Sequence, residues 1–221
     1  MGLFSRRRPP VTVTYAPRGV DGDLDQTVRF RNGSETGLRP VLQFQPVDHY
    51  GRDLPNVEVG TVLGIDRGAV VAPPGQDAVD VLHFHGMGAR HVRGVRIMAT
   101  TIEPVDLADL SQPVEAVMVD LERRATLDPE EFWGVGVVNR NESPASVSVT
   151  LIQLEDPAES GDDPRQAVDA VTLAEPVELP SKGHDVVWLP DDVRGRFHAV
   201  LAQVVVPWTG PLDPEVGPDP V

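Results

Sequence analysis

The side chains best suited to chemistry in this chain are two histidines, His83 and His85, separated by a single residue. Residues i and i+2 of a β-strand point to the same face, so both imidazoles could bind one zinc or copper ion. A third ligand would come from His91, six residues after His85, or from His49 or Asp80. Metal-dependent activity at His83 and His85 is therefore one hypothesis for function.

The alternative interpretation of the same pair is structural. His83 and His85 would occupy the solvent face of a strand whose opposite face carries Leu82 and Phe84. Two histidines without a fixed third ligand do not specify a metal site, so we favour this interpretation. We expect no stoichiometric metal and no cofactor.

A second group of potential ligands is the acidic stretch with Asp156, Glu159, Asp162 and Asp163. Carboxylates suit calcium, but this spacing lacks the alternating ligands and fixed glycine of a calcium loop. We interpret it as a solvated acidic loop. The chain also has no HExxH sequence, phosphate loop, kinase element or nucleophile elbow, and we do not expect an enzyme.

Basic side chains gather at Arg6–Arg8 and again around Arg90, His91, Arg93 and Arg96. Either cluster could contact an acidic protein surface or a phosphate. The formal net charge of the chain is −15, whereas binding to nucleic acid requires a basic face. Nucleic acid is therefore not the expected partner, and we interpret the arginines as exposed positions on strands and loops.

Three tryptophans are the large side chains that could stack on a sugar or another small ligand. We expect Trp133 and Trp188 to belong to a hydrophobic core. Trp208, at the boundary of a proline-rich tail, is the one expected to be accessible. Binding of a small ligand or carbohydrate is the second functional alternative.

The elements that position these residues are predicted to be strands. Val28 and Phe30 alternate with Arg29 and Arg31, which is the two-residue period of a half-buried strand. A single helical turn is expected at Asp128–Glu131, where Pro follows an N-cap residue, and at most one more around Leu107–Leu110. The predicted strands lie at 11–15, 28–31, 38–47, 57–63, 69–72, 78–85, 91–102, 114–121, 132–138, 146–154, 167–173, 177–179, 185–189 and 197–206. Short strands at this spacing predict an all-β fold of the sandwich type.

An internal repeat divides the chain into two halves. Asn32 and Asn139, Glu35 and Glu142, Phe44 and Leu151, and Pro73 and Pro180 are each separated by 107 residues. We therefore predict two tandem immunoglobulin-like or fibronectin-III-like β-sandwiches that arose by internal duplication. Each would have about 100 residues, enough to bury a core without metal or disulfide.

This repeat gives five expected segments. Residues 1–10 are a basic flexible arm, 11–103 the first β-sandwich and 104–113 a linker between prolines. Residues 114–208 are the second β-sandwich, and 209–221 an acidic, proline-rich tail.

Composition indicates a cytoplasmic protein. The chain has no cysteine, which excludes disulfides and cysteine–zinc sites. Its amino terminus has no apolar run of the length expected for a signal peptide, and the most apolar segment, near 199–206, is too short to span a bilayer.

The stretch from Phe44 to Gly51, with the later turn at Pro74 and Gly75, resembles the FxLYD type of immunoglobulin-like module. That family places an aromatic strand, an Asp turn ending in Gly and a Pro-Gly turn in this order. Phe44, Asp48, Gly51, Pro74 and Gly75 carry the resemblance. The second half keeps Asn139, Leu151, Leu154 and Pro180 but loses the Asp-x-x-Gly turn. The resemblance implies a β-sandwich that binds or spaces rather than catalyses.

These observations favour a non-catalytic interaction or assembly protein that presents surfaces of two β-sandwiches. Its partner would be another protein or a larger assembly, because exposed sheet edges and faces can accept another chain.

Overall fold

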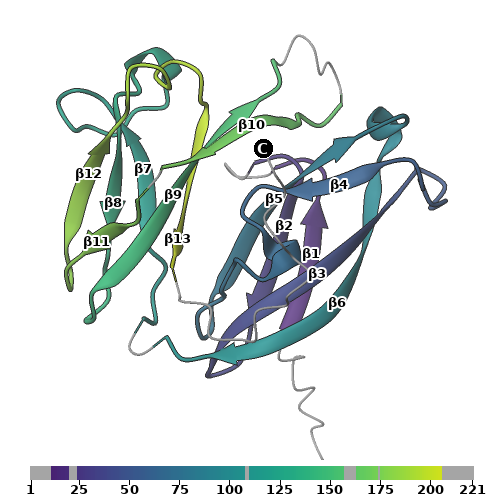
Figure 1. Cartoon of the computed structure of the whole chain (residues 1–221), viewed down its shortest axis with the longest axis horizontal. Coiled ribbons are helices and arrows are strands. Elements are labelled where there is room, and N and C mark those ends of the chain that lie inside the picture. Colours follow the sequence, from purple (N-terminus) through teal and green to yellow (C-terminus); the bar gives the residue numbers. More distant parts are fainter. Residues whose placement is uncertain (1–10, 20–23, 108–109, 157–162, 174, 206–221) are drawn as a thin grey trace, which may run out of the picture.

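The computed structural model describes residues 11–19, 24–107, 110–156, 163–173 and 175–205. The expected arm, most of the acidic loop and the tail with Trp208 lie outside these residues. The described chain is all-β, built of several antiparallel sheets and consistent with a β-sandwich (Figure 1). No described helix has the length and apolar character that a membrane span requires.

The first half forms two antiparallel sheets. One has the order β1-β2-β5-β4, and the other pairs β3 with β6. Its strands are β1 (Val11–Ala16), β2 (Thr27–Asn32), β3 (Gly37–Val47), β4 (Glu58–Thr61), β5 (Asp77–His85) and β6 (Gly94–Val105).

The second half forms two more sheets. One has the order β12-β8-β7, and in the other β9 pairs with β10, β11 and β13. Its strands are β7 (Glu115–Val119), β8 (Gly134–Val138), β9 (Ala145–Leu154), β10 (Ala167–Thr172), β11 (Val177–Leu179), β12 (His184–Trp188) and β13 (Ala199–Val204).

Alternation of apolar and polar side chains produces a separate core in each half. On β2, Val28 and Phe30 are fully buried while Arg31 is exposed, as the two-residue period predicts. Phe30 and Leu42 lie in the first core, and Phe132 and Leu151 lie in the second. Phe44, paired with Leu151 by the repeat, is half-buried against the first core.

Most expected strands are present, with local differences. Residues 69–72 form no strand and contribute only a bridge from Ala72 to Leu38. The last strand of the first half begins at Gly94, because His91 lies in a 3-10 turn (η2, Ala89–His91), and it continues past 103 to Val105. Two further 3-10 turns are η1 (Ile65–Arg67) and η3 (Pro129–Glu131).

The expected single turn at Asp128 is confirmed. The Asp128 carboxylate accepts a hydrogen bond from the Glu130 amide, and Pro129 occupies the first position of η3.

A buried asparagine closes the corner between β2 and β3. The Asn32 Nδ2 amide donates to the carbonyls of Thr36 at 2.7 Å, Ala72 at 3.0 Å and Pro73 at 3.1 Å. Its Oδ1 accepts from the Ser34 amide at 2.9 Å. One side chain thus joins the β2–β3 turn to the segment that precedes β5.

Asn139 makes the corresponding contacts after β8. Its Nδ2 amide donates to the carbonyls of Ser143 at 2.9 Å and Pro180 at 3.0 Å, and its Oδ1 accepts from the Asn141 amide at 3.0 Å. Each of these residues follows its counterpart in the first half by 107 positions. The strand pairing repeats as well, because β1-β2-β5 corresponds to β7-β8-β12 and β3-β6 to β9-β13.

Two Asp turns also resemble each other, but they follow different strands. After β3, the Asp48 carboxylate accepts from the amides of Tyr50 and Arg52, and Gly51 has φ 75°. After β7, Asp120 makes the same contacts with Glu122 and Arg124. Here Arg123, φ 64°, takes the place of the glycine. The second half therefore does contain an Asp turn, at a place that the 107-residue offset does not predict.

Candidate functional site

The two halves meet through a small hydrophobic cluster of their own. Val81 from β5 packs with Ile152 and Leu154 from β9 and Ala167 from β10, and all four are buried. Figure 1 shows this side of the second half, with β9, β10 and β13, turned toward the first half. Val81 lies on the same face of β5 as His83 and His85. That face is therefore solvated only at one end, because the second half covers the rest.

Polar contacts reinforce this junction. The Arg165 amide donates to Asp25 Oδ2 at 2.8 Å, and the Phe84 amide donates to Gln166 Oε1 at 3.3 Å. Arg93 forms an ion pair with Asp163 at 3.0 Å.

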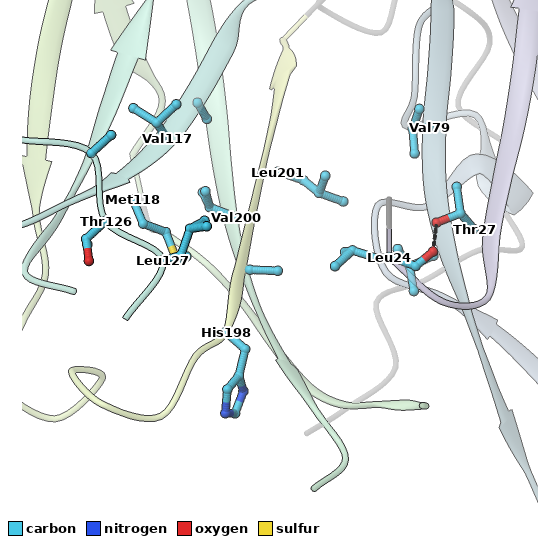
Figure 2. Close-up of a pocket in the computed structure, with 14 residues that line it drawn as sticks. Leu24, Thr27, Val79, Val117, Met118, Thr126, Leu127, His198, Val200 and Leu201 are labelled. Atoms are coloured by element: carbon cyan, nitrogen blue, oxygen red, sulfur yellow. Dashed lines mark hydrogen bonds between the residues drawn. The ribbon is translucent and has the colours of Figure 1, made fainter. Parts of the chain in front are cut away.

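Beside this junction lies an apolar groove with a volume of about 430 Å³, which both halves line (Figure 2). Leu24, Thr27 and Val79 face it from the first half, across from Leu201 of β13, while Val200 lies beside Met118 and Leu127. The complete lining comprises Leu24, Thr27, Val79, Val81, Ala116, Val117, Met118, Ala125, Thr126, Leu127, His198, Ala199, Val200 and Leu201. The volume falls within the range of small-molecule sites, roughly 300–1,000 Å³.

The Asp120 turn sets one wall of this groove. The turn folds the chain back along β7, where the Thr126 amide donates to the Met118 carbonyl at 3.0 Å and Ala125 bridges to Val119. Leu127 follows directly and is 91% exposed, although it lies on the groove.

The chemistry of the groove is hydrophobic. Charged residues make up 24% of the chain, yet Asp, Glu, Lys and Arg are absent from the described lining. His198, at one end of the groove in Figure 2, is its only ionisable side chain among those residues. Val117 on β7 is 44% exposed. The groove therefore presents an apolar surface suited to an apolar ligand or to apolar side chains of a partner.

The histidine pair lies at the other end of the β5 face. The rings of His83 and His85 are edge to face, with centroids 4.7 Å apart, and His83 is half-buried against Gly60 of β4. Burial lowers the pKa of His83, and the neighbouring His85 lowers it further, while Asp66 opposes both. Both features favour a neutral imidazole, the form that binds metals.

None of the three expected third ligands joins this pair. His91 is exposed in η2, and the His49 ring contacts the Tyr50 ring at a tilt of 44° in the Asp48 turn. Within the part of the chain that is described, no three His, Asp or Glu side chains converge to hold a metal ion. The described residues therefore offer a metal ion at this place two ligands at most, His83 and His85.

Asp80 is unavailable for a different reason. It lies on the core face of β5 with Leu82 and is fully buried. Its carboxylate accepts from the amides of Leu63 and Val81 at 2.7 Å and of Ile65 at 2.8 Å. Burial raises the pKa of Asp80 to about 6, against the lowering effect of these hydrogen bonds. Its role is to fix the turn before η1.

The tryptophans differ from expectation in one case. Trp188 is 44% exposed, so the prediction that it serves the second core is wrong. It ends β12 and covers Gly134 of β8, where a β-carbon would lie 3.0 Å from the Trp188 ring. Trp133 is half-buried, with the Arg194 guanidinium 4.1 Å from its ring centre.

Two of the arginines around η2 bind acidic side chains of the same chain. Arg93 binds Asp163, and Arg96 donates to Asp53 at 2.6 Å and to the Gly51 carbonyl at 2.6 Å. Arg90 is exposed. Of the acidic loop, Asp156 and Asp163 are described, while Glu159 and Asp162 lie outside the described residues.

The groove itself was missed by sequence reasoning. Its residues come from five separate segments and are ordinary aliphatic side chains without a motif. The one local signal was Leu127, an apolar residue between Thr126 and Asp128 in a predicted loop. Comparison with protein-family models, with curated proteins and with solved structures finds no match.

Proposed function

We propose that this protein is a non-catalytic interaction or assembly protein, and that the apolar groove between its halves is where a protein partner binds. The groove is the observation that carries the proposal. It has an exposed apolar wall at Leu127 and Val117 and no charged side chain in its described lining. Exposed apolar patches with a polar surround are typical of interaction sites.

We further propose that the two halves are immunoglobulin-like sandwiches derived by duplication. Three features support this: the 107-residue offset, the repeated strand pairing, and the matched contacts of Asn32 and Asn139. Such sandwiches offer faces and edges for binding and do not themselves supply a catalytic group. The partner would contribute apolar side chains to the groove, with its polar groups at the rim.

The test is recovery of partners from the native cell by the full chain and by two matched variants. Leu127→Asp places a charge on the groove. Leu121→Asp places the same charge in the Asp120 turn, at a residue that is 60% exposed and does not line the groove. We expect wild type and Leu121→Asp to retain the same protein, and Leu127→Asp to lose it at least ~10-fold, since burying an unpaired charge is costly. Equal retention by both variants, or turnover in a substrate screen, would contradict the proposal.

A second candidate is binding of a small apolar ligand, which the groove volume favours. The dye 8-anilinonaphthalene-1-sulfonate is a suitable probe. Dye fluorescence that Leu127→Asp abolishes and Leu121→Asp preserves, without any protein partner recovered, would favour this candidate over the first.

A further inference from the structure

A long exposed strand forms the outer border of the first half. β6 pairs with β3 along one edge, and no other described strand pairs with it (Figure 1). Residues 98–104 are all exposed, with Met98 at 53% and Ile102 at 38%. An unpaired strand edge presents backbone donors and acceptors that another strand can satisfy.

The middle of this strand has no charge and no proline to prevent pairing, since Pro104 lies beyond it. Residues 97–102 are uncharged and include two isoleucines and two threonines, residues with high β-propensity. Charge appears only at the flanks, as Arg96 before the run and Glu103 after it. Edge strands avoid self-association when like charges would face each other, but here the two flanking charges are opposite.

A β-bulge in β6 places the two flanking charges, Arg96 and Glu103, on the same face of the strand. Along β3, Leu42 pairs with Ala99 and Val41 with Thr101, so Thr100 is an extra residue in β6. The insertion shifts the alternation of side chains by one position. Arg96 and Met98 therefore share a face with Thr101 and Glu103, while Ile97 and Ile102 share the opposite face.

We propose that two copies of this chain associate through β6, pairing antiparallel about a twofold axis between Ala99 and Thr100. Facing residues of an antiparallel pair must lie on the same face of the sheet. In a strand without a bulge, neighbouring residues point to opposite faces, so a twofold axis between two residues would pair residues from opposite faces. With the bulge, Ile97 faces Ile102 of the second copy, and Met98 faces Thr101.

The charges select a second copy of this chain as the occupant. In this register Arg96 of each copy faces Glu103 of the other, so both ends of the pairing bring opposite charges together. Twofold association through one self-complementary patch is also the commonest form of oligomer. Arg96 binds Asp53 through Nη1 and the Gly51 carbonyl through Nη2. Its Nε–H is the group that would donate to Glu103 of the second copy.

The first experiment is a disulfide test on the full chain, which has no cysteine of its own. The double variant Met98→Cys, Thr101→Cys places facing thiols within disulfide range in the proposed dimer. In either single variant, the thiols of the two copies would be about 10 Å apart along the strands. We expect oxidised glutathione to produce a covalent dimer from the double variant and none from the single variants.

The second experiment measures the oligomer by sedimentation equilibrium from about 1 to about 200 µM, a range that covers small interfaces. Glu103→Arg, which brings Arg to face Arg96, should raise the dissociation constant of the dimer about 10-fold, and Arg96→Glu with Glu103→Arg should restore it. Glu58→Arg, an exposed site on β4, is the matched control and should have no effect. A monomer at all concentrations, or a dimer that the double-cysteine variant fails to cross-link, overturns the proposal.

Discussion

Replacing Asn32 by alanine tests whether its hydrogen bonds hold the corner between β2 and β3 together. Asn32 is fully buried, and its amide group serves three carbonyls with only two hydrogens, so one hydrogen bond is shared. Asn32→Ala therefore removes the equivalent of two donated hydrogen bonds, together with the part-buried ones that Oδ1 accepts from Ser34. Each donated bond is worth about 1 kcal/mol, and the buried carbonyls that lose their donor add to the cost. We expect a loss of roughly 2–3 kcal/mol in the free energy of unfolding.

The assay is urea unfolding followed by far-UV circular dichroism and by tryptophan fluorescence. The described tryptophans, Trp133 and Trp188, both belong to the second half, so their fluorescence reports that half. The first half must be followed by circular dichroism. Because Val81 and Ile152 bury surface between the halves, we expect the Asn32→Ala loss in both signals.

Matched variants make this reasoning refutable. Asn56→Ala removes an exposed asparagine and should change stability by no more than about 0.5 kcal/mol. Asn139→Ala should behave like Asn32→Ala, because it loses two amide hydrogen bonds of 2.9 and 3.0 Å. If Asn32→Ala costs no more than Asn56→Ala, the asparagine does not hold the corner together.

Two further perturbations probe the core and the junction. The pKa of Asp80 is raised to about 6, mainly by burial, so its stabilising contribution is present below pH ~4 and is lost as the pH rises through 6. Relative to Asp80→Asn, wild-type stability measured by urea unfolding should thus fall by on the order of 3 kcal/mol between pH 4 and 7; a flat difference would contradict this. Ile152→Ala should cost about 3 kcal/mol and separate the fluorescence and dichroism transitions, whereas exposed Val168→Ala should do neither.

Local features of the fold followed from the sequence, because they depend on neighbours in the chain. The alternation at Val28–Arg31 identified β2, and Pro129 after Asp128 identified η3. Strand boundaries were less predictable. His91 was expected to begin a strand but lies in η2, which follows Gly88, a residue with φ 107°.

Features that depend on contact between distant segments could not be predicted. The alternation along β5 assigned the face with Val81 and His83 to solvent, yet Val81 is fully buried because Ile152 and Ala167 cover it. Periodicity says which side of a strand is apolar, but not which other segment covers it. The prediction that Trp188 is a core residue was wrong because a large aromatic residue at a strand end can cover the glycine beside it without entering the core.

The two proposed surfaces lie on different sheets of the first half. The groove is lined by Thr27 of β2 and by Val79 and Val81 of β5, while β6 belongs to the sheet that it forms with β3. A strand added to the free edge of β6 extends the β3–β6 sheet and leaves the groove residues in place. Dimerisation and partner binding are therefore compatible. A dimer of this kind carries two grooves, so a partner with two binding segments gains avidity that a monomer cannot provide.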